Sequence, residues 1–250
     1  MEENIWNRKM VLTTTDNQKD ALSHTNEGIV ILNNDELKIV TMNEMRKFND
    51  EFTILGNERL GPNMMLMLSP YDDKTYVKVD ESRTQLALEK GLLTVRFCSL
   101  LGATSIKVIN IKQTNLDKKM EALLEGGAQG YSAEVQANIE TMERIKNQIS
   151  VEATARGGKP KLEIAERLLQ DNNLKSDSFF KNLLNMVKDY DGEENRIGTL
   201  TQNVLLSHSM ADSLEIVGNL KFPVGYVKGN YKSVLTQKEE IYMSLEISFE

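Results

Sequence analysis

The 250-residue sequence contains few of the residue types on which several common chemistries depend. Its single cysteine excludes an intrachain disulfide and a zinc site built from cysteine ligands. Two histidines leave little material for a His-rich metal site or a His-based catalytic triad. With 15 glycines and 4 prolines, the chain is neither collagen-like nor dominated by linkers.

What is present is typical of a globular protein. Hydrophobic residues make up 40% and charged residues 27%, and the chain is long enough to bury a sizeable core. The net charge of −7 opposes non-specific binding to nucleic acid or anionic lipid, because the long-range field repels phosphate. No run approaches the roughly 18 apolar residues of a membrane-spanning helix, and the N-terminus lacks a signal-peptide pattern. We therefore expect a cytoplasmic protein, and the lone Cys98 agrees with a reducing compartment.

Three segments show the spacing of amphipathic helices, at about 81–101, 160–171 and 177–191. In the first, Ser82 and Gln85 match a capping box, and Gly102 follows the last apolar residue, where a left-handed cap is favoured. A shorter helix is expected around 44–48.

Several short segments are rich in β-prone residues. The runs 29–32 and 37–40 flank strong turn residues and predict a hairpin, while 10–12 and 64–68 predict single short strands. The run 105–111 has apolar residues on both faces, which predicts a central strand.

Residues 131–155 carry two competing periodicities. Apolar or small residues occupy the odd positions, which favours a β-hairpin at about 130–156 with one face in water. The same stretch also fits a single long helix, because apolar residues recur at helical spacing among good helix formers. They are Val135, Ile139, Met142, Ile145 and Ile149.

The alternating C-terminal run predicts a second hairpin at about 225–249. This segment and 130–153 each begin with a Gly-Tyr pair and follow an apolar stretch ending in glycine, so we consider an internal duplication of a helix–strand–hairpin unit, with halves 81–156 and 177–250. The expected architecture is α+β with a mixed or antiparallel sheet. It comprises an N-terminal arm, 1–27, and a single domain, 28–250.

Two candidate sites involve acidic residues. Glu36 and Lys38 on a predicted strand could serve a metal-dependent nuclease, with Asp16 or Asp20 as the second acid. Surface charge beside a turn explains them more simply. Asp72 and Asp73 could hold a divalent cation, but acids near a helix N-terminus also stabilise its dipole without a metal.

One stretch of this acidic chain is locally basic and aromatic, and it is the candidate interaction surface: Tyr226, Lys228, Tyr231 and Lys232. A solvated strand face is the simpler interpretation. Cys98 lies on the apolar side of a predicted helix, which is typical of a small core residue.

The leading functional hypothesis is a non-catalytic protein-interaction and assembly module. Because no catalytic constellation is apparent, and because long alternating strands offer edges for pairing, we expect a protein partner or self-association into a homo-oligomer. No cofactor is expected, nor is a nucleic acid partner. The alternatives are a soluble oligomeric pore-former that inserts amphipathic hairpins into a membrane, and a metal-dependent nuclease or hydrolase.

Overall fold

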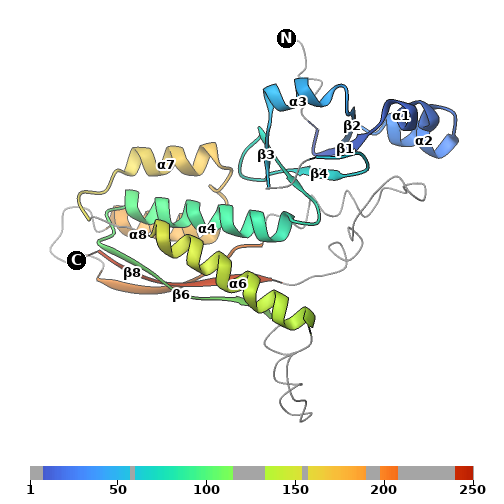
Figure 1. Ribbon diagram of the computed structural model, residues 1–250. Helices are drawn as coiled ribbons and strands as arrows, with labels where there is room; N and C mark the ends of the chain where they lie inside the picture. The colour runs from blue at the N-terminus through green and yellow to red at the C-terminus, as the bar shows by residue number, and fades with distance from the viewer. Residues whose placement is uncertain are drawn as a thin grey trace. The chain divides into compact units, whose positions relative to one another are not determined.

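The computed structural model describes residues 8–56, 60–114, 133–153, 157–189, 198–207 and 240–249, and they form a mixed α+β fold (Figure 1). This confirms the predicted fold class. The chain divides into two compact units, with the change between Gln85 and Leu86; the last described segment, 240–249, belongs to the second unit.

The first unit is built on a five-stranded mixed sheet. Its elements are β1 (Met10–Thr14), α1 (Asp16–Ser23), α2 (Asn26–Leu32), β2 (Leu37–Thr41), α3 (Met45–Glu51), β3 (Thr53–Leu55), β4 (Met65–Leu68) and β5 (Thr75–Lys78). The strand order is β2-β1-β4-β5-β3. β1 pairs parallel with β2 and β3 with β5, while β4 runs antiparallel to both of its neighbours.

Residues 8–27, expected as an arm, supply β1 and α1 to this unit. The predicted short strand is confirmed, and Met10, Val11 and Leu12 are fully buried. α1 begins at a capping box in which Thr15 and Gln18 satisfy each other's backbone N–H groups.

An aromatic cluster forms the core on one face of this sheet, under α3. The ring of Phe48 lies 4.9 Å from that of Phe52 and 5.2 Å from that of Tyr76. The Tyr76 hydroxyl donates to the Arg8 carbonyl, and burial raises the pKa of Tyr76 to about 12. The predicted elements at 44–48 and 64–68 are confirmed as α3 and β4.

The predicted hairpin at 29–40 is wrong in its first half, because α2 replaces the first strand. Thr25 caps α2 by accepting a hydrogen bond from the Gly28 amide. A Cβ at Gly28 would collide with the Leu22 carbonyl, so glycine allows α2 to fold back closely on α1. β2 then pairs with β1 instead of with a preceding hairpin strand.

The second unit packs helices against a three-stranded antiparallel sheet. Its elements are α4 (Ser82–Leu100, which begins in the first unit), β6 (Ser105–Gln113), α6 (Ala133–Glu152), α7 (Leu162–Asp171), α8 (Ser178–Asp189), β7 (Thr199–Leu205) and β8 (Ile241–Ser248). The strand order is β6-β8-β7. α4, α6 and α8 lie on one side of this sheet (Figure 1). The predicted helices at 81–101, 160–171 and 177–191 are confirmed as α4, α7 and α8.

β8 confirms the predicted C-terminal strand and is the central strand of this sheet. Its alternate side chains Ile241, Met243, Leu245 and Ile247 are all fully buried. Both of its edges are occupied, by β6 and β7, rather than by an earlier strand of a hairpin. Residues 225–239 of the expected hairpin lie outside the described residues.

Among the strands that the structure describes, β6 is an edge strand, which corrects the prediction of a central strand at 105–111. The register shifts between Val108 and Asn110, so a β-bulge places Ile109 on the exposed side. Ile106, Val108 and Ile111 then share the buried face. The apolar residues on both apparent faces were therefore caused by the bulge.

The predicted hairpin at 130–156 is wrong, because this segment forms the single helix α6. Of the residues at helical spacing, Val135, Met142, Ile145 and Ile149 are buried and Ile139 is half-buried, whereas Val151, a member of the alternating set, is 75% exposed. The proposed duplication loses the first of its two hairpins, and residues 225–239 of the second copy lie outside the described residues. The membrane-inserting hypothesis also loses the hairpin that motivated it.

α6 crosses α4 at Gly91, and this crossing supplies a stability test. A Cβ at Gly91 would collide with Cδ1 of the fully buried Ile149. We expect Gly91→Ala to destabilise the unit by about 1–2 kcal/mol, because overpacking outweighs the gain in helix propensity. Ile149→Val removes Cδ1 at a cost of about 1 kcal/mol. The double variant should recover about 1–2 kcal/mol relative to the sum of the single changes in urea denaturation. If the changes in unfolding free energy of the two single variants were strictly additive, the side chains at positions 91 and 149 would not be in contact.

Candidate assembly edge

The direction of the backbone groups in β7 follows from two hydrogen bonds at its ends. The Leu206 amide donates to the Ile241 carbonyl at 2.7 Å, and the Phe249 amide donates to the Gly198 carbonyl at 3.2 Å. Even-numbered residues of β7 therefore bond to β8. Because backbone groups alternate in direction along an antiparallel strand, the odd-numbered residues point theirs away from the sheet.

One of these outward groups is already bonded to a buried lysine. Lys90 of α4, 1% exposed at its side chain, donates to the Leu205 carbonyl at 2.7 Å and to Asp177 Oδ2 at 2.6 Å. Asp177 in turn caps α8, since its Oδ1 accepts from the Phe179 amide at 3.0 Å. Lys90 thus joins α4, α8 and β7, and it marks the end of the open part of the strand edge.

Thr199, Thr201 and Asn203 make up that open part, which we call the β7 edge. Within the described residues, their outward N–H and C=O groups have no hydrogen-bond partner. Their side chains are exposed on the face of the sheet opposite the helices. There, Thr199 and Asn203 make hydrogen bonds with Ser248 and Ser244 of β8, at 3.0 and 2.6 Å. These cross-strand bonds hold β7 in a regular extended form.

The two edges of the sheet differ in how they are protected. β6 carries Lys107, Lys112 and the bulge, and the Lys146 ammonium of α6 donates to the Ile109 carbonyl at 2.6 Å. Charge, bulges and covering groups are the usual means of preventing edge-to-edge pairing. β7, with the sequence TLTQNVL, has no charged residue and no register shift.

A groove of about 250 Å³ runs beside β7 on the helix side of the sheet. It is lined by Ser178, Phe179, Asn182, Leu183 and Met186 of α8 and by Gln202 and Asn203 of β7. Phe179 and Met186 are partly exposed there, as is Leu200 on the same side of β7. An extended chain added to the β7 edge would therefore meet an apolar groove with its side chains.

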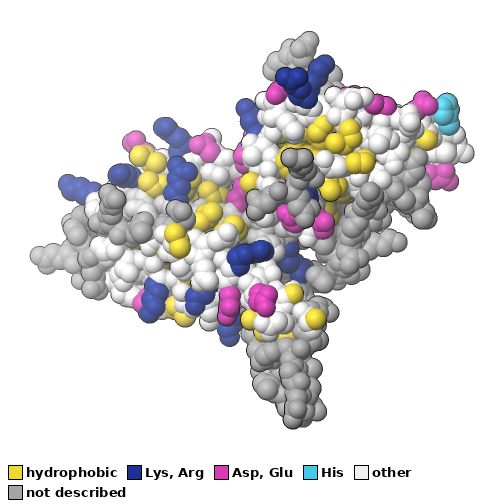
Figure 2. All heavy atoms as spheres, viewed as in Figure 1, with side chains coloured by type: hydrophobic (Ala, Val, Ile, Leu, Met, Phe, Trp, Pro, Cys, Tyr) yellow, Lys and Arg dark blue, Asp and Glu magenta, His cyan; other side chains and the backbone are white. Residues whose placement is uncertain are grey.

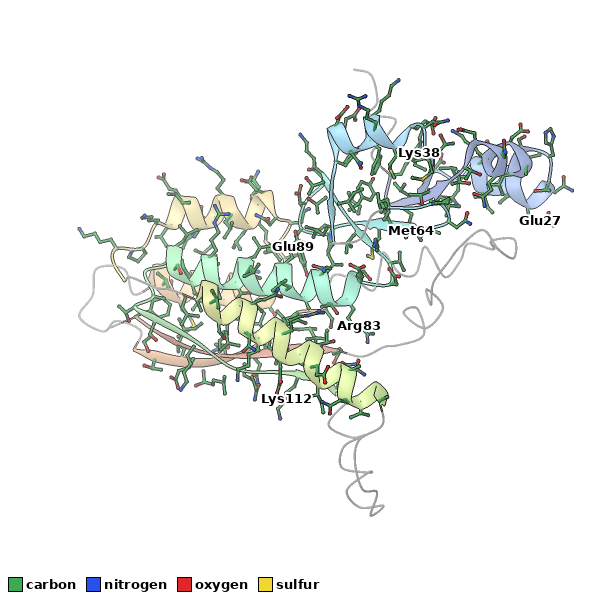
Figure 3. The ribbon with its side chains drawn as sticks, viewed as in Figure 1. Glu27, Lys38, Met64, Arg83, Glu89 and Lys112 are labelled. Atoms are coloured by element: carbon green, nitrogen blue, oxygen red, sulfur yellow. The ribbon has the colours of Figure 1, made fainter. Side chains whose placement is uncertain are left out.

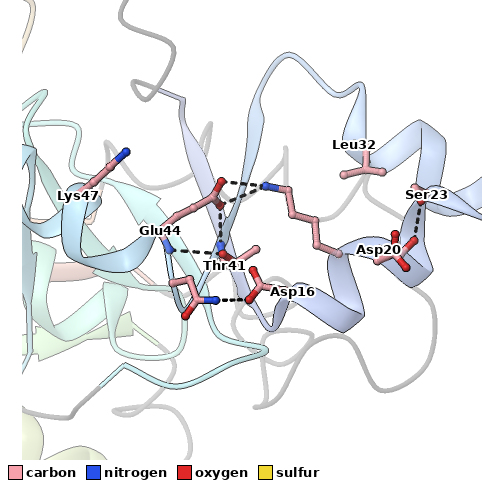
Figure 4. Close-up of a pocket in the computed structure, with 9 residues that line it drawn as sticks. Asp16, Asp20, Ser23, Leu32, Thr41, Glu44 and Lys47 are labelled. Atoms are coloured by element: carbon pink, nitrogen blue, oxygen red, sulfur yellow. Dashed lines mark hydrogen bonds and ion pairs between the residues drawn. The ribbon is translucent and has the colours of Figure 1, made fainter.

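The first unit has a polar cleft of about 520 Å³ at the carboxyl ends of the parallel strands β1 and β2 (Figure 4). Lys19 pairs with Glu44 at 3.1 Å, and the Thr41 amide donates to Glu44 at 2.9 Å. Burial alone would raise the pKa of Glu44, but the bonds from Thr41 and Lys19 outweigh it and hold this pKa below its usual range. Asn43 donates to Asp16. In this cleft Lys19 and Glu44 are thus paired with each other, and the Asp16 carboxylate accepts from an amide.

The structure does not bring the candidate nuclease residues together. Glu36 precedes β2 and pairs with Lys9 at 3.2 Å, whereas Asp16 follows the opposite end of the parallel strand β1. Lys38 lies in β2 near α3 (Figure 3). Burial lowers its pKa, as does the charge of Lys19, against an opposing effect of Glu44.

Asp72 and Asp73 lie in the turn between β4 and β5. Both oxygens of Asp72 serve the turn, accepting from the Lys74 amide at 2.9 Å and the Thr75 hydroxyl at 2.6 Å, while Asp73 is exposed. In the part of the chain that the structure describes, no three His, Cys, Asp or Glu residues are placed to hold a metal ion.

Of the remaining candidate residues from the sequence, one is buried and the others lie outside the described residues. Cys98 is fully buried as predicted, and burial raises the pKa of its thiol to about 12. The interaction candidates Tyr226, Lys228, Tyr231 and Lys232 lie outside the described residues. Figure 2 shows basic and acidic side chains interspersed over the visible face, without a large patch of one sign.

Sequence reasoning missed the β7 edge. The signal was present, since 199–205 alternates polar and apolar residues at most positions and carries no charge.

Comparison of the chain with protein families, curated proteins and solved structures finds no match. Among the described helices, none combines the length and apolar character needed to cross a membrane.

Proposed function

We propose that the protein is a non-catalytic interaction and assembly module that self-associates by adding a strand at the β7 edge. The observation that carries this proposal is the row of outward backbone groups at Thr199, Thr201 and Asn203, which have no hydrogen-bond partner within the described residues. An extended partner strand would satisfy these groups, as in other complexes formed by strand addition.

The composition of the edge supports a protein partner rather than a charged ligand. β7 offers backbone donors and acceptors, an uncharged sequence and an adjoining apolar groove. In strand addition, the main chain supplies affinity and such pockets supply specificity. We also propose a cytoplasmic location, which suits a protein whose single cysteine is a buried free thiol.

The experiment compares Thr201→Pro with Thr201→Val. Proline removes the outward N–H of residue 201 but no bond to β8, because that amide faces away from the sheet. Valine keeps the N–H and is well suited to a strand. We expect the wild type and Thr201→Val to associate, and Thr201→Pro to raise the dissociation constant at least about tenfold in sedimentation velocity.

Circular dichroism and thermal unfolding should show that both variants remain folded. A wild type that is monomeric at every concentration would contradict self-association. Equal association of the proline variant and the wild type would exclude the β7 edge as the contact.

A further inference from the structure

We infer that the partner at the β7 edge is β7 of a second copy, antiparallel about a two-fold axis at Thr201, with Leu200 of each copy in the other's groove between α8 and β7. This inference rests on the proposed function and specifies its partner and register. It uses three features of the second unit: the direction of the backbone groups, the bond from Lys90 to Leu205, and the groove beside α8.

The register follows from which backbone groups are available. In an antiparallel pair of identical strands related by a two-fold axis, the residue at the axis lies opposite its own copy, and residues equally distant from it on either side lie opposite each other. With Thr201 opposite its own copy, Thr199 lies opposite Asn203 and all three outward residues meet outward residues. Each such pair exchanges two bonds, which gives about six backbone hydrogen bonds.

Neighbouring symmetric registers use fewer of these groups. Moving the axis toward the C-terminus sets Thr199 opposite Leu205, whose carbonyl already accepts from Lys90. Moving it the other way sets Asn203 opposite residue 197, which lies outside both β7 and the described residues, so that only Thr199 and Thr201 meet open groups of the other copy. The Thr201 axis therefore matches the open segment that Lys90 delimits.

The same register carries Leu200 to the groove of the other copy. On the helix side of the sheet, Leu200 of one strand would lie opposite Gln202 of its partner. Gln202 lines the groove together with Phe179 and Met186. The partly exposed Leu200 side chain of each copy would thus be transferred from water into the groove of the other copy. The two uncharged strands would meet without like-charge repulsion.

Single cysteines test this register directly. Directly opposed residues of a hydrogen-bonded antiparallel pair have Cα atoms about 5.5 Å apart, which suits a disulfide. Under diamide, two such thiols give up two electrons and two protons to the oxidant and join. The native Cys98 is a silent background, because it is fully buried and burial raises the pKa of its thiol to about 12.

We expect Thr201→Cys to form a covalent dimer with itself on non-reducing gels. Thr199→Cys and Asn203→Cys should each remain largely unlinked alone and should link when the two variants are mixed. Leu200→Lys should raise the dissociation constant at least about tenfold, whereas Leu200→Met should change it by less than about threefold.

Two results would overturn the inference in distinguishable ways. If the protein associates but Thr201→Cys does not link, or Thr199→Cys links to itself, the register is wrong and the proposed function stands. If the wild type is monomeric throughout and none of the cysteine variants links, the inference and the proposed function both fail.

Discussion

Replacing Lys90 by methionine is expected to lower the free energy of unfolding of the second unit by about 3–5 kcal/mol. The ammonium is buried and bonds to Asp177 and to the Leu205 carbonyl, at 2.6 and 2.7 Å. Methionine fills similar volume but leaves Asp177, itself only 19% exposed, without its cation. Removing one partner of a buried pair costs far more than the pair contributes as a whole.

Urea denaturation, followed with a probe that reports on the second unit, measures this loss of unfolding free energy. Lys181→Met on α8 is the matched control, because Lys181 is exposed and its replacement should change stability by less than about 0.5 kcal/mol. The double variant Lys90→Met with Asp177→Asn removes both charges and keeps a capping side chain, so it should recover part of the loss. A loss below about 1 kcal/mol for Lys90→Met would show that the three elements are not joined through this ammonium.

Phe48→Ala is expected to destabilise the first unit by about 3–5 kcal/mol. Phe48 is fully buried and packs against Phe52 and Tyr76, so the change leaves a cavity at the centre of the aromatic cluster. Hydrogen exchange should show faster exchange throughout β1, β2 and β5, whose buried residues line this core.

The neighbouring exposed residue supplies the control for this change. Lys47→Ala keeps the helical position and should leave exchange in the same strands unchanged. Unchanged protection in β1 and β2 of the Phe48→Ala variant would mean that the cluster does not hold the sheet to α3.

Helical periodicity predicted the helices best where only one period was present. The prediction placed α4, α7 and α8, and in α7 and α8 the buried residues form one apolar stripe. α6 carries two periods, and the sequence alone could not show that Ile149 would pack at Gly91. In the folded unit Ile149 and most of the helical set are buried, and Val151 is exposed.

Sheet order was harder to predict, because it depends on partners distant in the chain. β-prone residues at 29–32 form α2, where Thr25 and the Gly28 amide start a helix beside α1. The bulge at Ile109 made an edge strand look central. Alternation identified β8 as a strand, but nothing local indicated that β6 and β7 would occupy its two edges.

The candidate site was missed for the same reason. Sequence reasoning concentrated on side chains that carry chemistry, such as Glu36, Lys38 and Asp72, whereas the β7 edge consists of main-chain groups. Those groups are available only because β8 bonds to one side of β7 and Lys90 ends the open segment at Leu205. Both facts arise from tertiary structure, although the absence of charge in 199–205 could be read in advance.

On the proposed function, the unequal protection of β6 and β7 would leave the described sheet of the second unit with one strand edge for pairing. If association uses only the uncharged strand, the opposite margin, with the Ile109 carbonyl held by Lys146, offers no template for another copy. Assembly would then saturate at pairs as concentration rises, and solutions would stay clear where a doubly open sheet would polymerise into fibrils.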